Sequence, residues 1–286
     1  MRSVAINRVK NTARRLLPKN QFARSVSILA GGTAAGQAII VAASPILTRL
    51  YSPEDFGVLA VFTALLGILS VIVSLRYSCA IPLPESDEKA ACVAVLAMLV
   101  VLGMTGLSIL LVIVFRQEIA TLLNVSALSV YLWLLPAGLL LVGIYDVFNF
   151  WAIRIRAFPA IARTRLVQAI STVTMQLGGY MLGPLALILG NIGGQAAGAS
   201  SLGVLAIHKR RRCFRNVRIG RVWWVLRRYK RFPIYSAWGA LFNTTSTQLP
   251  ALLFASLFSV TSAGLFILAY KILALPSSLI GRAFGE

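Results

Sequence analysis

Long apolar runs separated by short basic segments are the feature that most constrains this chain. Hydrophobic residues occupy 58% of the 286 positions and charged residues 13%, roughly half the charged share of soluble domains. Nearly all basic residues fall into three blocks, 2–24, 154–165 and 209–231. Since a helix needs about 20 mainly apolar residues to cross a bilayer, the pattern predicts an all-α polytopic membrane protein.

The apolar runs predict about eight transmembrane helices. Their expected ranges are 26–49, 56–75, 90–115, 128–150, 164–181, 185–207, 234–257 and 261–281. The runs and the basic blocks together predict four segments. These are a cytoplasmic basic tail (1–24), an amino-terminal six-helix lobe (25–207), a basic cytoplasmic loop (208–233) and the start of a second lobe (234–286).

The distribution of Lys and Arg predicts the orientation of these helices. Basic residues gather in the connections that stay on the cytoplasmic side of a membrane. With the amino terminus inside, all three basic blocks fall on that side, and the outward connections hold only Arg49 and Arg116. We therefore expect a cytoplasmic amino terminus.

The net charge of +20 would suggest nucleic-acid binding in a soluble domain. Here the basic blocks adjoin membrane spans, where inward positive charge is the rule, so no nucleic-acid partner is expected. The three cysteines, Cys79, Cys92 and Cys213, lack metal-ligand spacing, and His208 is the one histidine. Neither a metal nor another cofactor is expected from this pattern.

Glycines recur at four-residue spacing in two expected helices. Gly190, Gly194 and Gly198 share one helix face, and Gly32 and Gly36 repeat the spacing near the amino terminus. Because such faces let a neighbouring helix approach closely, we interpret them as packing surfaces rather than as ligand sites.

A faint internal repeat relates the two ends of the chain. Residues 50–65 align with residues 257–272 at one constant offset, and Gly57 matches Gly264 in this alignment. Each stretch comprises a helix end, a short outward turn and the start of the next helix. Their parallel orientation suggests two lobes related by an axis along the membrane normal.

Several segments resemble the bacterial polysaccharide-biosynthesis flippases, the O-antigen and exopolysaccharide translocases. The segments are SPILTRLYSPEDFG (44–57), SLRYSCAIPLPESDEKA (74–90), FWAIRIRAFPAIARTRLVQ (150–168), YKRFPIYSAWGALFNTTSTQLPALL (229–253) and LPSSLIGRAFGE (275–286). These flippases belong to the multidrug, oligosaccharidyl-lipid and polysaccharide exporter superfamily and have two complete lobes. The resemblance therefore implies a truncated chain, which ends after the opening helix pair of the second lobe.

The resemblance implies transport without covalent chemistry. Family members move an undecaprenyl-diphosphate-linked oligosaccharide from the inner to the outer leaflet of the bacterial inner membrane. The implied partners are this lipid-linked oligosaccharide, membrane lipids, and a glycan polymerase or chain-length regulator. Because hydrocarbon does not solvate a diphosphate, the substrate needs a cationic cavity that opens alternately to each side of the membrane.

Ionisable residues within spans are the first candidates for binding such a substrate. The candidates, with two amides from a polar stretch, are Lys271, Arg49, Arg76, Arg154, Gln248 and Asn243. Lys271 lies near the middle of the last expected helix, about 15 Å from either interface at 1.5 Å per residue. Asp146, the one acid inside an expected helix, would pair with Arg154 or Arg76 or relay a coupling proton.

Each candidate also has a structural interpretation, which for Lys271 is snorkelling of its side chain towards an interface, a long reach from the middle of a span. Arg49 would serve as an interface anchor or pair with Glu54 or Asp55, and the positive-inside rule alone accounts for Arg76 and Arg154. The amides would bind sugar hydroxyls or join helices to one another. These amides are Gln37, Asn149, Gln176, Gln195, Asn243 and Gln248.

Two other functions fit parts of the pattern. A cation-coupled multidrug exporter of the same superfamily would need acids in its cavity, whereas the excess of base favours an anionic substrate. A membrane enzyme of glycan assembly would need paired carboxylates or metal-binding acids. The one acid cluster, Glu85, Asp87 and Glu88, falls in an expected loop, so no enzyme activity is expected.

Overall fold

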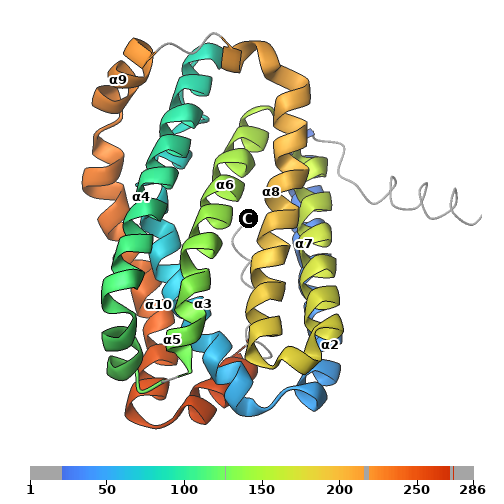
Figure 1. Ribbon diagram of the computed structural model, residues 1–286. Coiled ribbons are helices and arrows are strands. Elements are labelled where there is room, and N and C mark those ends of the chain that lie inside the picture. The colour runs from blue at the N-terminus through green and yellow to red at the C-terminus, as the bar shows by residue number, and fades with distance from the viewer. Residues whose placement is uncertain (1–20, 126, 216–218, 271–272, 274–286) are drawn as a thin grey trace, which may run out of the picture.

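The computed structural model describes residues 21–125, 127–215, 219–270 and 273, with side chains from residue 27 onward except at 207–215, 219 and 221. This part of the chain contains helices and no strands (Figure 1). The prediction of an all-α protein is therefore confirmed.

Most expected spans correspond to helices with shifted ends. The first four elements are α2 (Gln21–Leu50), α3 (Pro53–Val73), the 3-10 turn η1 (Tyr77–Ala80) and α4 (Asp87–Leu122). Next come α5 (Leu128–Tyr131), η2 (Leu132–Leu134), α6 (Leu135–Arg154), α7 (Phe158–Gly178), η3 (Tyr180–Leu182) and α8 (Pro184–Arg215). The chain continues with α9 (Ile219–Arg228), the π-helical turn η4 (Phe232–Ser236), α10 (Ala237–Leu257) and a helix over Val260–Tyr270.

Four stretches of the described chain are long and apolar enough to cross a membrane by length and composition. They are Ser27–Leu50, Pro53–Val73, Asp87–Leu122 and Leu128–Arg154. The helices α7, α8 and α10, which were also predicted as spans, run alongside these in the same bundle (Figure 1). The chain is thus a multi-pass membrane protein.

The helices pack in an order that differs from their order in the sequence. The helix α7 contacts both α2 and α8, α6 contacts α8 and α4, and α10 packs on α3. The short helix α9 lies against α4, at the end of the bundle where α8 ends (Figure 1). As a result, α2 and α7 lie on the side of the bundle opposite to α9.

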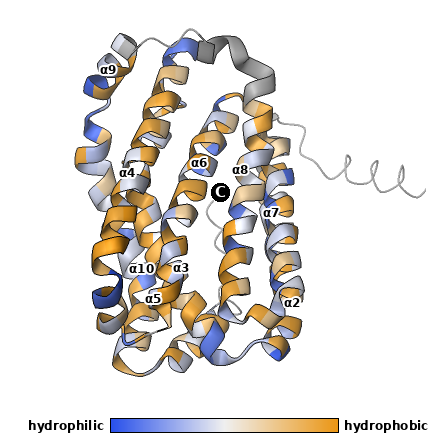
Figure 2. Ribbon diagram, in the orientation of Figure 1, coloured by the Kyte–Doolittle hydropathy of each residue, from blue (hydrophilic) through white to orange (hydrophobic). Residues whose placement is uncertain are grey.

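Apolar side chains fill the bundle interior and also cover part of its exterior. Trp151 and Phe62 are fully buried, while Leu110 and Val114 on α4 are each 61% exposed. Figure 2 shows α4 as hydrophobic along its middle and hydrophilic towards its ends. An exposed apolar helix face with all backbone groups bonded internally is what a lipid environment requires.

Bare glycine faces bring α7 close to both of its neighbours. A Cβ atom added at Gly190 or Gly194 of α8 would collide with Gln176 or Thr172 of α7, and one added at Gly32 of α2 would collide with Ala162. The prediction that these faces serve close helix packing is confirmed. Their approach also shapes the polar cavity described next.

Candidate functional site

A polar cavity of about 220 Å³ lies between α2, α7 and α8. Its lining residues come from all three helices. They are Thr33, Gly36, Gln37 and Ile40 of α2, Arg165, Gln168, Ala169 and Thr172 of α7, and Asn191, Gly194 and Gln195 of α8. Amides and hydroxyls of this kind are suited to hydrogen-bonding an uncharged polar ligand, while Arg165 adds a positive charge.

The amides of the cavity also join its walls. Gln168 Nε2 donates to Gln195 Oε1 over 3.3 Å, and nearby Thr164 and Ser201 hydroxyls lie 3.1 Å apart. Both interactions connect α7 to α8. Of the predicted amides, Gln37 and Gln195 are among the residues that line the cavity. Gln195 thus joins α8 to α7 while it lines the cavity, and its contact with a ligand stays a prediction.

Arg165 connects the cavity to a second polar cluster. Its guanidinium carbon lies 5.3 Å from the centroid of the Tyr145 ring, which is within cation–π range. Its Nε is buried and has no hydrogen-bond partner among the described residues. A buried donor without an acceptor costs free energy, so the described residues leave this arginine incompletely satisfied.

The second cluster centres on Asp146 of α6. Ser78 Oγ donates to Asp146 Oδ2 over 2.6 Å, and the Ser74 hydroxyl lies 3.1 Å from that of Ser78. Arg76 and Arg165 both act on the Asp146 carboxylate electrostatically. The acid therefore lies within electrostatic range of two cations, and no close ion pair joins it to a basic side chain among the described residues.

Backbone geometry at the end of α3 brings Arg76 and Ser78 to this cluster. Leu75 and Arg76 adopt left-handed conformations, with φ of 46° and 62°, and the 3-10 turn η1 follows at once. Non-glycine residues rarely adopt this region, and such strain persists where the surrounding structure holds it. The Nε of Arg76 is buried without a partner among the described residues.

Arg154 faces a different part of the structure. Its Nε donates to Asp87 Oδ1 over 3.2 Å, and its NH1 donates to the carbonyl of Pro84 over 2.6 Å. Further donor contacts reach the carbonyls of Ile81, Pro82 and Glu85. The guanidinium thus fastens the connection between η1 and α4 and pairs with Asp87, not with Asp146.

The remaining predicted residues lie away from the cavity. Arg49 is exposed at the end of α2, and Asp55, one of its expected partners, instead completes the capping box with Ser52 at the start of α3. Asn243 is exposed on α10, while Gln248 packs against Gly67 of α3.

Three more predicted residues complete this comparison, and the first, Asn149 of α6, is not among the residues that line the cavity. Gln176 is buried and donates to the carbonyl of Leu187 over 3.1 Å, so it joins α7 to α8. Lys271 lies outside the described residues. The substrate-binding roles of the six candidates and the coupling role of Asp146 stay predictions.

The pKa of one thiol reflects the polar cluster. Burial raises the pKa of Cys79 in η1, the positive charge of Arg76 lowers it, and the negative charge of Asp146 raises it. The thiol is half-buried, outside the spanning helices. The pKa of Cys79 therefore depends on the charges of both Arg76 and Asp146.

A family model described as "Polysaccharide biosynthesis protein" matches residues 46–285. The chain belongs to the polysaccharide biosynthesis protein family. This match covers every element from the end of α2 onward, including Arg76, Asp146 and Arg165, and it confirms the resemblance seen in the sequence. No curated protein gives a significant sequence match to this family member.

One solved structure shares the fold of this polysaccharide biosynthesis protein. It is described as the inward-facing conformation of a multidrug resistance MATE family transporter of the MOP superfamily, with a TM-score of 0.61 and 16% sequence identity. The similarity covers 87% of the present chain and 63% of the transporter chain. At this identity the likeness establishes the fold, and the present chain spans less than two thirds of the transporter.

Proposed function

We propose that this protein acts in the transport of an anionic lipid-linked oligosaccharide across the bacterial inner membrane, with its amino terminus in the cytoplasm. The family concerns polysaccharide biosynthesis and the fold is that of a transporter. Together they point to transport rather than to catalysis. The orientation rests on the basic blocks, which the positive-inside rule assigns to the cytoplasm.

The observation that carries this proposal is Arg165 in the wall of an amide-lined cavity. Sugar hydroxyls would find hydrogen-bond partners in Gln37, Gln168 and Gln195, while the Arg165 guanidinium supplies the cavity wall with a positive charge for a phosphate. A charged group within a membrane is costly unless it has a functional or structural partner. An undecaprenyl-diphosphate-linked glycan presents both sugar hydroxyls, which complement the amides, and phosphate oxygens, which complement the guanidinium.

A multidrug exporter is the second candidate, since the similar solved structure is named as one. Its cationic drugs would call for acids in the binding cavity. The cavity lining holds one cation and no acid among the described residues, and Asp146 is hydrogen-bonded to Ser78 in a cationic setting. The charge of the site therefore favours an anionic substrate.

Binding of undecaprenyl diphosphate to the purified chain in lipid nanodiscs tests the proposal. We expect Arg165→Gln to weaken binding about tenfold or more, since a hydrogen bond to a charged group contributes about 1.5–3 kcal/mol. Arg163→Gln is the matched control, because Arg163 lies on the same helix with an exposed side chain. Equal affinity in the two variants would show that the cavity does not bind the diphosphate, and would contradict the proposed function of the cavity.

A further inference from the structure

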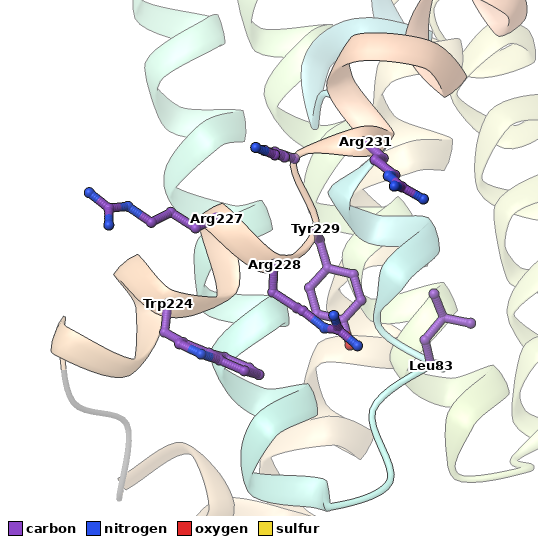
Figure 3. Close-up of a pocket in the computed structure, with 7 residues that line it drawn as sticks. Leu83, Trp224, Arg227, Arg228, Tyr229 and Arg231 are labelled. Carbon is purple, nitrogen blue, oxygen red and sulfur yellow. The ribbon is translucent and has the colours of Figure 1, made fainter.

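A basic pocket lies on the opposite side of the bundle from the polar cavity. It has a volume of about 830 Å³ and is formed mainly by the end of α9 and the turn that follows (Figure 3). Its lining residues are Leu83, Trp224, Arg227, Arg228, Tyr229, Lys230 and Arg231. Leu83 comes from the connection between η1 and α4, so two segments distant in sequence meet here.

The helix α9 has the features of a helix at a membrane surface. Val225 is 1% exposed and packs into the core, whereas Trp223 and Trp224 are 58% and 52% exposed. Short amphipathic helices with basic polar faces and exposed Trp lie at the boundary between headgroups and acyl chains. Tryptophan is enriched at this depth because its ring is amphipathic. We expect the pocket to lie at that boundary, because α9 packs on α4 at the end of the bundle where α8 ends.

The pocket concentrates positive charge that no acidic side chain among the described residues neutralises. Four of its seven lining residues are Lys or Arg and none is acidic, and none of the four forms an ion pair with a described side chain. Arg227 stacks 5.4 Å from the centroid of the Trp223 ring. Arg227 and Arg228 lie in the last turn of α9, where a cation interacts favourably with the helix dipole. Lys230 and Arg231 lie beyond the end of this helix, so its dipole does not account for their charges.

We propose that this pocket binds the phosphate headgroup of an anionic phospholipid of the inner leaflet, phosphatidylglycerol being the simplest. A phosphate would offset the repulsion among the four cations, and Arg and Lys donors suit its oxygens. Leu83 and Trp224, which are both exposed and apolar, would contact the glycerol and upper acyl region.

The location of the pocket favours a resident phospholipid over the transported substrate. The helix α9 packs on α4, while the polar cavity lies between α2, α7 and α8. Figure 1 shows these groups of helices on opposite sides of the bundle. A lipid bound here would hold α9 against α4 without entering the cavity, so this inference does not rest on the proposed transport function.

Lipid binding by native mass spectrometry tests the proposal. The full chain, delipidated in detergent, is titrated with phosphatidylglycerol and separately with phosphatidylcholine. We expect phosphatidylglycerol to bind about tenfold more tightly. The triple variant Arg228→Gln, Lys230→Gln and Arg231→Gln should lose that preference. The triple control Lys89→Gln, Arg156→Gln and Arg163→Gln removes the same charge from exposed positions and should retain it.

Three outcomes would overturn the proposal. The first is equal behaviour of the two triple variants, and the second is no preference for phosphatidylglycerol in the natural chain. The third is displacement of phosphatidylglycerol by a lower concentration of undecaprenyl diphosphate in the natural chain but not in the pocket variant, which would assign the pocket to the substrate.

A second measurement needs no substitution and so does not depend on the folding of a variant. A phosphatidylglycerol analogue with a photoreactive headgroup is cross-linked to the natural chain in nanodiscs, and the labelled peptides are identified. We expect label within residues 222–231 and at the connection that carries Leu83. Label distributed over the basic segments without enrichment at these residues would contradict a specific site.

Discussion

Gly57 of α3 and Gly264 of the final described helix lie at a crossing where two backbones touch. A Cβ atom added at Gly57 would collide with the carbonyl oxygen of Val260, and one added at Gly264 would collide with the carbonyl oxygen of Pro53. Neither neighbour is a flexible side chain. Both positions therefore require glycine for close approach rather than for a special φ angle.

The two contacts are reciprocal within the internal repeat. The offset that pairs Gly57 with Gly264 also pairs Pro53 with Val260. Gly57 thus meets Val260, and Gly264 meets Pro53, the residue that the repeat pairs with Val260. Reciprocal contacts of this kind characterise an interface around a two-fold axis. This geometry supports the repeat more strongly than the few identical residues do.

Substitution of either glycine should separate the two helices. We expect Gly57→Ala or Gly264→Ala to lower stability by about 1–3 kcal/mol, the usual range for overpacking, measured as thermal unfolding in detergent. The control is Gly103→Ala on α4, where nothing lies within 4 Å of the added atom. That change should be neutral or stabilising by up to about 1 kcal/mol. A similar melting temperature for all three variants would contradict the tight crossing.

Arg154 should be required for the connection between η1 and α4. Arg154→Ala removes the guanidinium that donates to Asp87 and to several carbonyls, and we expect a loss of about 1–3 kcal/mol. Arg154→Lys should recover little of this, because an ammonium group cannot span the several acceptors that the planar guanidinium reaches. Limited proteolysis within residues 81–87 measures the effect locally. Cleavage no faster than in Arg156→Ala would show that the contacts are dispensable.

Asp146 and Arg165 should be energetically coupled. Asp146→Asn keeps an acceptor for Ser78 but removes the charge that offsets Arg76 and Arg165, so the folded state should be destabilised. Adding Arg165→Gln removes one of the uncompensated cations, and part of the loss should be recovered. We expect a coupling energy of about 0.5–3 kcal/mol in a double-mutant cycle of thermal unfolding. Strictly additive effects would show that Asp146 and Arg165 do not interact energetically.

The spans could be predicted from the sequence because burial in lipid demands long apolar runs, and the glycine faces followed from their spacing. The helix α9 was missed for a physical reason. A helix at a membrane surface is short and half basic, so its composition matches that of a loop. Its apolar residues at 222, 225 and 226 lie at helical spacing, which is the signal that could have identified it.

The cavity position of Arg165 was also missed. The predicted helix began at residue 164, which placed this arginine at a helix end with the inward basic residues. The helix α7 instead begins at Phe158, with Pro159 in its first turn, a common position for proline in a helix. Arg165 therefore lies two turns inside the helix. The role of Arg154 could not be foreseen, since its contacts join residues far apart in the sequence.

The reactivity of Cys79 should report both charges of the Asp146 cluster. Since burial raises the pKa of this thiol, and the thiolate is the reactive form, maleimide labelling should be slow at pH 7 and accelerate in alkaline solution. The positive charge of Arg76 favours the thiolate, so Arg76→Gln should raise the pKa and shift the labelling profile to higher pH. Asp146→Asn removes a negative charge and should shift it to lower pH.

The measurement uses a background of Cys92→Ala and Cys213→Ala, which leaves Cys79 as the one thiol. A change in exposure alone would alter the labelling rate at every pH by the same factor, whereas a change in pKa moves the midpoint of the profile. Opposite midpoint shifts in the two variants would therefore establish that both charges act on η1. Shifts in the same direction, or none, would contradict the placement of Arg76 and Asp146 near Cys79.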